Sequence, residues 1–118
     1  SVTGQPEPVR CDPVLIEELV SNILDNAAKY ALRPGGQLEV AICFQADNVL
    51  MRFRDDGPGI PDGLHERIFD RFFRIDTDQS LGCGLGLAIV NDVAQGHGGS
   101  ARCIATAGGS TFEITLPR

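Results

Sequence analysis

Hydrophobic residues recur every three or four positions over residues 15–31, a spacing that predicts an amphipathic α-helix. Asp12 followed by Pro13 predicts where this helix begins, because an aspartate accepts hydrogen bonds from the first free N–H groups and a proline fits the first turn. The Gly35-Gly36 pair, which directly follows a proline, predicts that the helix ends near Leu32.

Runs of alternating and β-branched residues predict four strands in two hairpins. The runs are separated by a polar turn in the first hairpin and by Gly108-Gly109 in the second. The first hairpin covers residues 37–44 and 49–54, and the second covers residues 100–106 and 110–116. A short leading strand is also expected near residues 8–11.

Further helices are predicted between the two hairpins, a short one over residues 64–73 and a full one over about residues 85–95. The order helix, two strands, helices, two strands is typical of an α+β domain. We therefore expect a two-layer α/β sandwich, in which a mixed, mostly antiparallel sheet of about five strands is covered by about three helices. The 118 residues are enough for one domain, residues 1–118, with residues 1–8 as a flexible leader.

The charge and composition exclude several classes of function. The formal net charge of −6 argues against a nucleic-acid partner and against direct contact with an anionic membrane. No stretch is as long and apolar as a membrane-spanning helix, and residues 1–9 are too polar for a signal peptide. The four cysteines include no Cys-x-x-Cys pair, so we expect no zinc site. We interpret them as reduced cysteines of a cytoplasmic protein, with a disulfide as the alternative.

All 14 glycines except Gly4 fall in clusters. One cluster, Gly82, Gly84 and Gly86, directly precedes a predicted helix, where free N–H groups and the helix dipole favour a phosphate chain. Its spacing matches neither the dinucleotide-binding motif nor the P-loop, so phosphate binding would have to follow another pattern.

The segment of residues 55–59, Asp-Asp-Gly-Pro-Gly, directly follows a predicted strand. A carboxylate at the end of a strand, followed by glycines that let the backbone approach a ligand, is typical of a binding site. A type II turn would use the same residue types, so the segment alone leaves both interpretations open.

Four polar residues form a stripe about 80° wide along the first predicted helix. They are Glu18, Asn22, Asn26 and Lys29. Asparagines are unfavourable inside helices, so two of them beside the hydrophobic face indicate a polar site next to this helix. A solvated helix edge would show the same pattern, and the helix alone does not decide between the two.

Taken together and in order, these segments resemble the motifs of the ATP-binding catalytic domain of sensor histidine kinases, which has the Bergerat fold. The resemblance covers residues 10–117. It is carried by residues 22–30, 55–59, 68–74, 82–87 and 108–112, the last running into Leu116-Pro117.

The resemblance implies a site for ATP and Mg²⁺. Asn26 would bind Mg²⁺, Asp55 would accept a hydrogen bond from the adenine amino group, and residues 76–81 would form a mobile lid. The implied catalytic residues are Asn22, Asn26 and Lys29. The implied ATP contacts are Asn22, Asn26, Lys29, Tyr30, Asp55, Gly57, Gly59, Ile60, Arg74, Gly82, Gly84, Leu85, Gly86, Leu87 and Thr111. Ser110 stands where a glycine is common in the family, a departure that removes none of these ligands.

The implied reaction is transfer of the γ-phosphate to a histidine. Related ATPases and serine kinases carry a general-base glutamate at the position of Asn22, and a neutral histidine acceptor needs no such base. The family carries that acceptor on a separate helical dimerisation domain, and the phosphate then passes to a response regulator, so we expect an isolated, monomeric catalytic domain here. The alternative is a non-catalytic ATP-sensing or partner-docking module of the same fold. An ATPase clamp is disfavoured by Asn22.

Overall fold

The computed structural model describes residues 2–4, 9, 11–30, 36–56, 67–70, 86–106 and 109–117. Within these ranges the chain forms five strands, two α-helices and one 3-10 turn. They follow the order β1 (Val2–Thr3), α1 (Pro13–Tyr30), β2 (Leu38–Phe44), β3 (Asn48–Asp55), η1 (Arg67–Phe69), α2 (Gly86–Gly96), β4 (Ser100–Thr106) and β5 (Gly109–Pro117).

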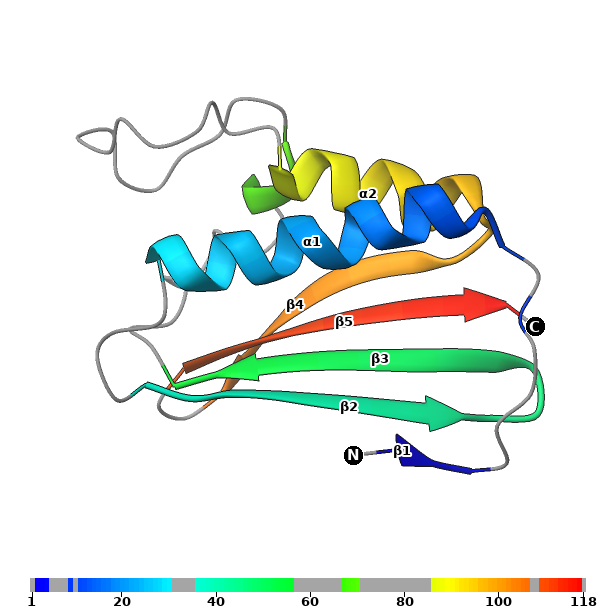
Figure 1. The fold of residues 1–118 in the computed structure, drawn as a ribbon, viewed down its shortest axis with the longest axis horizontal. Helices are drawn as coiled ribbons and strands as arrows, with labels where there is room; N and C mark the ends of the chain where they lie inside the picture. The colour runs from blue at the N-terminus through cyan, green and yellow to red at the C-terminus, as the bar shows by residue number, and fades with distance from the viewer. Residues whose placement is uncertain are drawn as a thin grey trace.

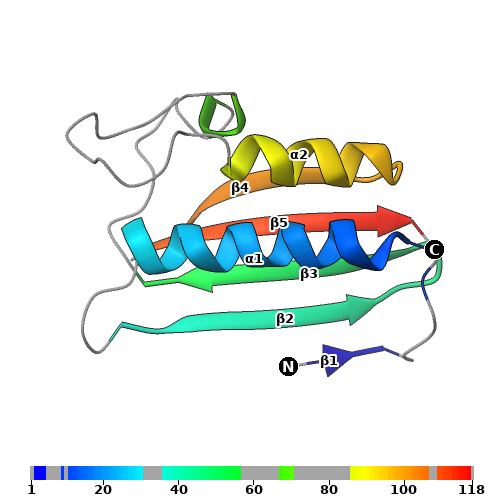
Figure 2. The ribbon, with the colours of Figure 1, turned by 45° about the horizontal axis from the view of Figure 1, so that its top comes forward.

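The strands form one sheet in the order β1-β2-β3-β5-β4. β1 pairs with β2 in parallel, and all other neighbours are antiparallel. Both helices lie on the same face of this sheet (Figure 1). α1 runs over the middle of the sheet and α2 over the β4 side, which leaves β1 and β2 beyond α1 (Figure 2). The predicted α+β sandwich with a mixed sheet is confirmed.

The start of α1 is the predicted one. The Asp12 Oδ1 atom accepts hydrogen bonds from the backbone N–H groups of Val14 (3.0 Å) and Leu15 (3.2 Å). These bonds satisfy N–H groups that have no partner within the helix. Leu19, Ile23 and Ala27 follow at four-residue intervals and are at most 5% exposed, so they form the buried face of the helix.

The register of the sheet separates its two faces. Phe53 pairs with Phe112 and Met51 with Ile114, and these side chains belong to the hydrophobic core beneath the helices. Because successive side chains of a strand point to opposite faces, the alternating positions lie on the face away from the helices.

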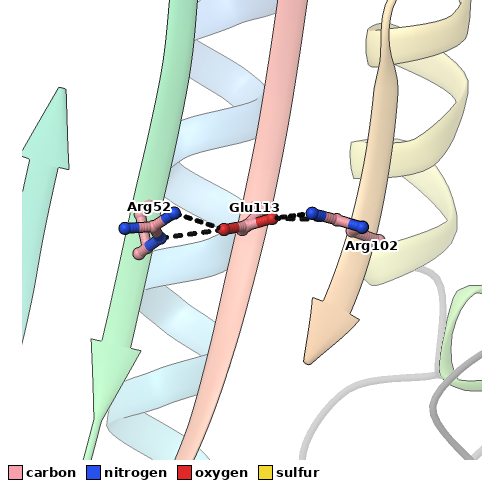
Figure 3. A network of polar contacts seen from close by, with 3 residues as sticks. All are labelled: Arg52, Arg102 and Glu113. Atoms are coloured by element: carbon pink, nitrogen blue, oxygen red, sulfur yellow. Dashed lines mark hydrogen bonds and ion pairs between the residues drawn. The ribbon is translucent and has the colours of Figure 1, made fainter. Parts of the chain in front are cut away.

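A charge cluster around one buried carboxylate lies on that opposite face. Glu113, which is 4% exposed, accepts hydrogen bonds from the Nε atoms of Arg52 and Arg102, each 2.8 Å long. The Nη2 atoms of the same arginines lie 2.7 and 2.6 Å from its two carboxylate oxygens. Figure 3 shows Glu113 on β5 between arginines of the two neighbouring strands. Burial alone would raise the pKa of Glu113, but the hydrogen bonds and charges of the two arginines together hold that pKa below its ordinary value.

Two expectations differ from the structure. The leading strand is Val2–Thr3, inside the stretch expected to be a leader, and residues 9 and 11 are not in a strand. It exists because Val2 and Thr3 pair with the edge of β2, which is a long-range event. The short helix expected over residues 64–73 is described only at residues 67–70, where a 3-10 turn, Arg67–Phe69, is followed by a bend. None of the described helices is both long and apolar enough to cross a membrane.

Candidate functional site

Four chain segments meet at one end of the molecule: the C-terminal end of α1, the end of β3, the start of β5 and the N-terminal end of α2 (Figure 1). Each carries residues that the sequence predicts to bind a ligand. The arrangement follows from topology, since β3 runs toward this end and β5 runs away from it in antiparallel register, with Asp55 paired to Ser110.

Asp55 is the buried centre of this end. It is the last residue of β3, it is 4% exposed, and it lies on the helix-facing side of the sheet together with Phe53. The Ser110 hydroxyl donates a buried hydrogen bond of 2.7 Å to its Oδ2 atom. A buried carboxylate thus stands at the end of the hydrophobic core, oriented by the neighbouring strand.

The backbones of β3 and β5 are very close at this point. A Cβ atom at Gly109 would overlap the carbonyl oxygen of Asp55, so a larger residue here would push the two strands apart. Gly109 therefore lets β5 begin directly beside Asp55.

Ser110 lies beside Asp55, and the prediction that Thr111 contacts ATP stays a prediction. Thr111 is the next residue along β5, so its side chain is on the opposite face of the sheet, where it pairs with Arg54. It is 3% exposed, and its hydroxyl has no hydrogen-bond partner among the described residues. The alternation of β5 could have shown this, because Ser110 has the same parity as the core residue Phe112 and Thr111 does not.

Asn22 and Asn26 lie next to the buried stripe of α1, and both are partly buried. The Nδ2 atom of Asn22 donates a hydrogen bond of 2.8 Å to the carbonyl oxygen of Glu18, one turn earlier in the helix. Because a carbonyl can only accept, this bond identifies the amide nitrogen and leaves the Asn22 amide oxygen as an acceptor. Lys29 lies in the last turn of α1, and its side chain is not described.

The two asparagines are on the side of α1 that faces α2. Leu15, Asn22 and Asn26 lie within about 40° of one another around the helix axis. Leu15 lines a shallow groove together with Val93 and His97 at the far end of α2. The same strip of α1 therefore contacts α2 at one end of the domain and presents asparagines at the other.

The structure describes the remaining predicted ATP contacts only in part. Gly86 and Leu87 begin α2, as predicted, and Leu87 packs against the core. Tyr30 ends α1, and its side chain is not described. Outside the described residues lie Gly57, Gly59, Ile60, Arg74, Gly82, Gly84, Leu85 and the expected lid of residues 76–81. Their roles stay predictions.

The negative charge of Asp55 affects the pKa of a neighbouring thiol, that of Cys103. Burial, reinforced by the charge of Asp55, raises the pKa of Cys103 to about 11. Cys103 pairs with Phe112 on the helix-facing side of the sheet, one row from Ser110. The thiol is therefore protonated at neutral pH, and its pKa reports the charge of Asp55.

Comparison with known proteins places this geometry among ATPases. Residues 11–118 match the family described as histidine kinase-, DNA gyrase B- and HSP90-like ATPase. The sensor protein KdpD of Escherichia coli (strain K12) is 38% identical over 120 residues, which cover 96% of this chain and 13% of KdpD.

Two solved structures resemble this one closely. The mycobacterial sensor histidine kinase MprB has a TM-score of 0.82 and 38% identity, covering 98% of this chain and 78% of that one. The catalytic domain of histidine kinase ThkA has a TM-score of 0.82 and 28% identity, covering 92% and 71%. The chain thus spans most of these structures but only about an eighth of KdpD.

Proposed function

Because the chain belongs to the family of histidine kinase-, DNA gyrase B- and HSP90-like ATPases, and its relatives are sensor histidine kinases, we propose that it binds ATP with Mg²⁺ and transfers the γ-phosphate to a histidine. In this proposal the acceptor histidine lies on a separate helical dimerisation domain, and a response regulator receives the phosphate next. The chain described here is the catalytic part of that system.

The observation that carries the proposal is the buried Asp55 carboxylate beside Ser110. An ionised carboxylate only accepts hydrogen bonds, so it favours a base with an exocyclic amino group, as in adenine, over one with a carbonyl oxygen there. The Ser110 hydroxyl donates to the Oδ2 atom of this carboxylate and so fixes its orientation. Burial strengthens this selectivity, because an unmatched polar group at a buried position costs free energy.

The asparagines of α1 fit the phosphate end of the nucleotide. Amide oxygens are ligands that Mg²⁺ accepts, and Asn26 lies one turn beyond Asn22 on the same side of the helix. The described residues contain no group of three His, Cys, Asp or Glu side chains that could hold a metal ion. Asn26 would therefore share Mg²⁺ with the phosphates, and the bound ion would supply positive charge against them. Lys29 and Arg74 would add fixed positive charge.

The transfer step needs positioning rather than a base. A lone pair on an unprotonated imidazole nitrogen forms the new N–P bond while the bond from the γ-phosphorus to the bridging oxygen breaks, and ADP leaves with that electron pair. A neutral imidazole already has an unprotonated nitrogen, so Asn22 can stand where water-activating relatives need a glutamate. Asn22 would then hold phosphate through the second hydrogen of its amide nitrogen, whose first hydrogen is donated to the Glu18 carbonyl.

The first experiment measures the affinity of the 118-residue chain for ATP with Mg²⁺ by calorimetry. We expect Asn26→Ala to weaken binding at least tenfold and Ser21→Ala, an exposed change on the same helix, to leave it unchanged. Equal affinity of the wild type and Asn26→Ala would refute the Mg²⁺ assignment, and absence of binding by the wild type would refute the function.

A second experiment tests transfer. The full-length protein, or this chain with a separately produced dimerisation domain, is incubated with radiolabelled ATP and Mg²⁺. We expect phosphate that is labile in acid and stable in base, as phosphohistidine is, and none with Asn26→Ala. ATP binding without such phosphate would favour the ATP-sensing alternative.

A further inference from the structure

The helix α1 has a second side that carries none of the residues assigned to nucleotide binding. We call this side the outer flank, and it is formed by Ile16, Glu17, Val20, Leu24 and Asp25. It borders a shallow groove lined by Cys11, Pro13, Ile16, Glu17, Val20, Ser21, Leu24 and Asp25. The groove starts at the N-terminal end of α1 and continues for about three helical turns.

The outer flank faces away from α2. Leu24 lies about 180° around the helix axis from Leu15, the residue that lines the groove shared with α2. Beyond α1 on that side lie β2 and β1 (Figure 2). Val40 is on the helix-facing side of β2, where it pairs with the core residue Phe53, yet it is 37% exposed. The sheet therefore extends past the helix and is incompletely covered there.

The groove is apolar, with its apolar side chains arranged as a helix-packing ridge. Ile16, Val20 and Leu24 lie four residues apart, and such a row fits the groove of a second helix. Leu24 is 40% exposed, whereas Ile16 and Val20 are partly buried and pack against the core, so they line the floor of the groove and Leu24 stands at its exposed end. A helix of about 12 residues would be long enough to cover the row.

The margin of the groove is acidic. Glu17 and Asp25 are exposed lining residues, and neither has an ion pair within the part of the chain that the structure describes. If two copies of this chain met at this groove, their carboxylates would repel one another. Each copy also has a net charge of −6, which further opposes self-association. The charge instead complements lysines and arginines on an approaching helix.

We propose that the outer flank docks an amphipathic helix of a partner protein, with apolar residues toward Ile16, Val20 and Leu24 and basic residues toward Glu17 and Asp25. This binding mode is that of a helix laid in an apolar groove with charged margins. The inference is independent of the nucleotide site, because the outer and α2-facing sides of α1 do not overlap.

The test uses two synthetic helical peptides that share one leucine face and differ in their margins, lysine in one and glutamate in the other. Each is titrated into isotopically labelled protein, and amide shifts are followed by NMR. We expect the lysine peptide to bind at least tenfold more tightly and to shift resonances of residues 13–25 and of β2.

Two variants separate docking from general attraction between opposite charges. Leu24→Asp adds a negative charge, so it would strengthen unspecific binding of the lysine peptide, whereas docking predicts at least a tenfold loss. Val14→Asp adds the same charge at a valine that is 71% exposed and does not line the groove, and we expect no loss. The double variant Glu17→Lys with Asp25→Lys should reverse the preference between the two peptides.

Three results would overturn the proposal. They are equal binding of the two peptides, shifts centred on other elements, and equal effects of Leu24→Asp and Val14→Asp. A concentration-dependent dimer in analytical ultracentrifugation that Leu24→Asp abolishes would assign the flank to a second copy instead. ATP affinity is measured in parallel, and we expect it to be unchanged in all of these variants.

Discussion

Asp55 and Glu113 are two buried carboxylates on neighbouring strands, and each is 4% exposed. Glu113 lies on the outer face of the sheet between two guanidinium groups, which donate to both of its oxygens (Figure 3). Asp55 lies on the helix-facing side at the end of β3 and receives a hydrogen bond from the neutral hydroxyl of Ser110. Equal burial thus accompanies different contacts, which include two guanidinium groups at Glu113 and a hydroxyl at Asp55.

We interpret the difference as one between a carboxylate that stabilises the sheet and a carboxylate that is proposed to bind a ligand. The two arginines bring opposite charge to Glu113 from β3 and β4, so the cluster links three strands and stabilises the fold. The Ser110 hydroxyl holds the Oδ2 atom of Asp55 at the start of β5, and Gly109 lets the two backbones approach each other there. In the proposed function, the Asp55 carboxylate selects the base of the nucleotide. Five predictions test this contrast.

The largest effect is expected from Asp55→Asn, which keeps the size of the side chain and removes its charge. Hydrogen bonds to charged groups contribute about 1.5–3 kcal/mol, so ATP affinity measured by calorimetry should fall roughly 10- to 100-fold. The matched change Glu113→Gln should leave affinity unaltered. Similar losses of ATP affinity in both variants would contradict the proposed difference between the two carboxylates.

Glu113→Ala should show the reverse pattern, with ATP affinity kept and the free energy of unfolding lowered. We expect a loss of about 1–3 kcal/mol in urea titrations, because Arg52 and Arg102 lose their shared acceptor but are exposed enough to be solvated. The control is Asp70→Ala, which removes an exposed partner 3.8 Å from Arg67 and should cost at most about 0.5 kcal/mol. Equal losses of unfolding free energy in Glu113→Ala and Asp70→Ala would show that the buried Glu113 stabilises the fold no more than an exposed ion pair does.

Ser110→Ala should weaken ATP binding less than Asp55→Asn does, by roughly two- to tenfold, because a neutral hydrogen bond contributes about 0.5–1.5 kcal/mol. Its control is Thr111→Val, which removes a hydroxyl from the opposite face of the sheet and should leave affinity unchanged. A loss of ATP affinity with Thr111→Val alone would support Thr111, the contact predicted from the sequence, rather than Ser110.

The pH dependence of stability should reveal Glu113 as well. Its pKa is lowered in the folded state, so the folded protein binds this proton less readily than the unfolded chain does. Its contribution is fully present above the ordinary value of 4.5 and is lost as the pH falls through the lower, folded value. The stability difference between the wild type and Glu113→Gln, followed by urea titration from pH 7 to pH 3, should therefore shrink on acidification. A constant difference would contradict this.

The smallest effect is expected at Cys103, whose pKa is raised to about 11 by burial and by the charge of Asp55. Asp55→Asn removes the second cause, so alkylation of Cys103 at pH 9 should become roughly two- to fivefold faster. Mass spectrometry can follow it, with the exposed Cys11 as an internal reference. Glu113→Gln should not change the rate, and an acceleration there would indicate loosened structure rather than charge.

Local signals predicted the elements well. The Asp12-Pro13 pair marked the start of α1, and the hydrogen bonds from Val14 and Leu15 confirm it. The strand over residues 100–106 has the predicted bounds, and β2, β3 and β5 differ by one residue at one or both ends. These features depend on neighbours within a few residues, which is why periodicity and capping patterns reveal them.

The residues of the candidate site were predicted less completely than the helices and strands. Asp55 was identified because it follows a strand and precedes glycines, and α1 carries the two asparagines as expected. Ser110 was not among the predicted contacts, although the alternation of β5 places it on the same side as Phe112. That it meets Asp55 follows only from the strand register against β3, and the role of Thr111 stays a prediction. The glycine motifs at residues 57–59 and 82–84 lie outside the described residues, so their part in the site stays a prediction.

The order of residues established the helix, the hairpins, the polar stripe of α1 and the position of Asp55 at the end of a strand, since each depends on local periodicity. It did not show that Arg52 and Arg102, which are 61 and 11 residues from Glu113, would share that carboxylate. Nor did it show that Val2 and Thr3 would extend the sheet, or that a groove with the exposed Leu24 would remain along one side of α1. Local patterns determine which faces a segment has, but long-range pairing and packing determine which of those faces meet.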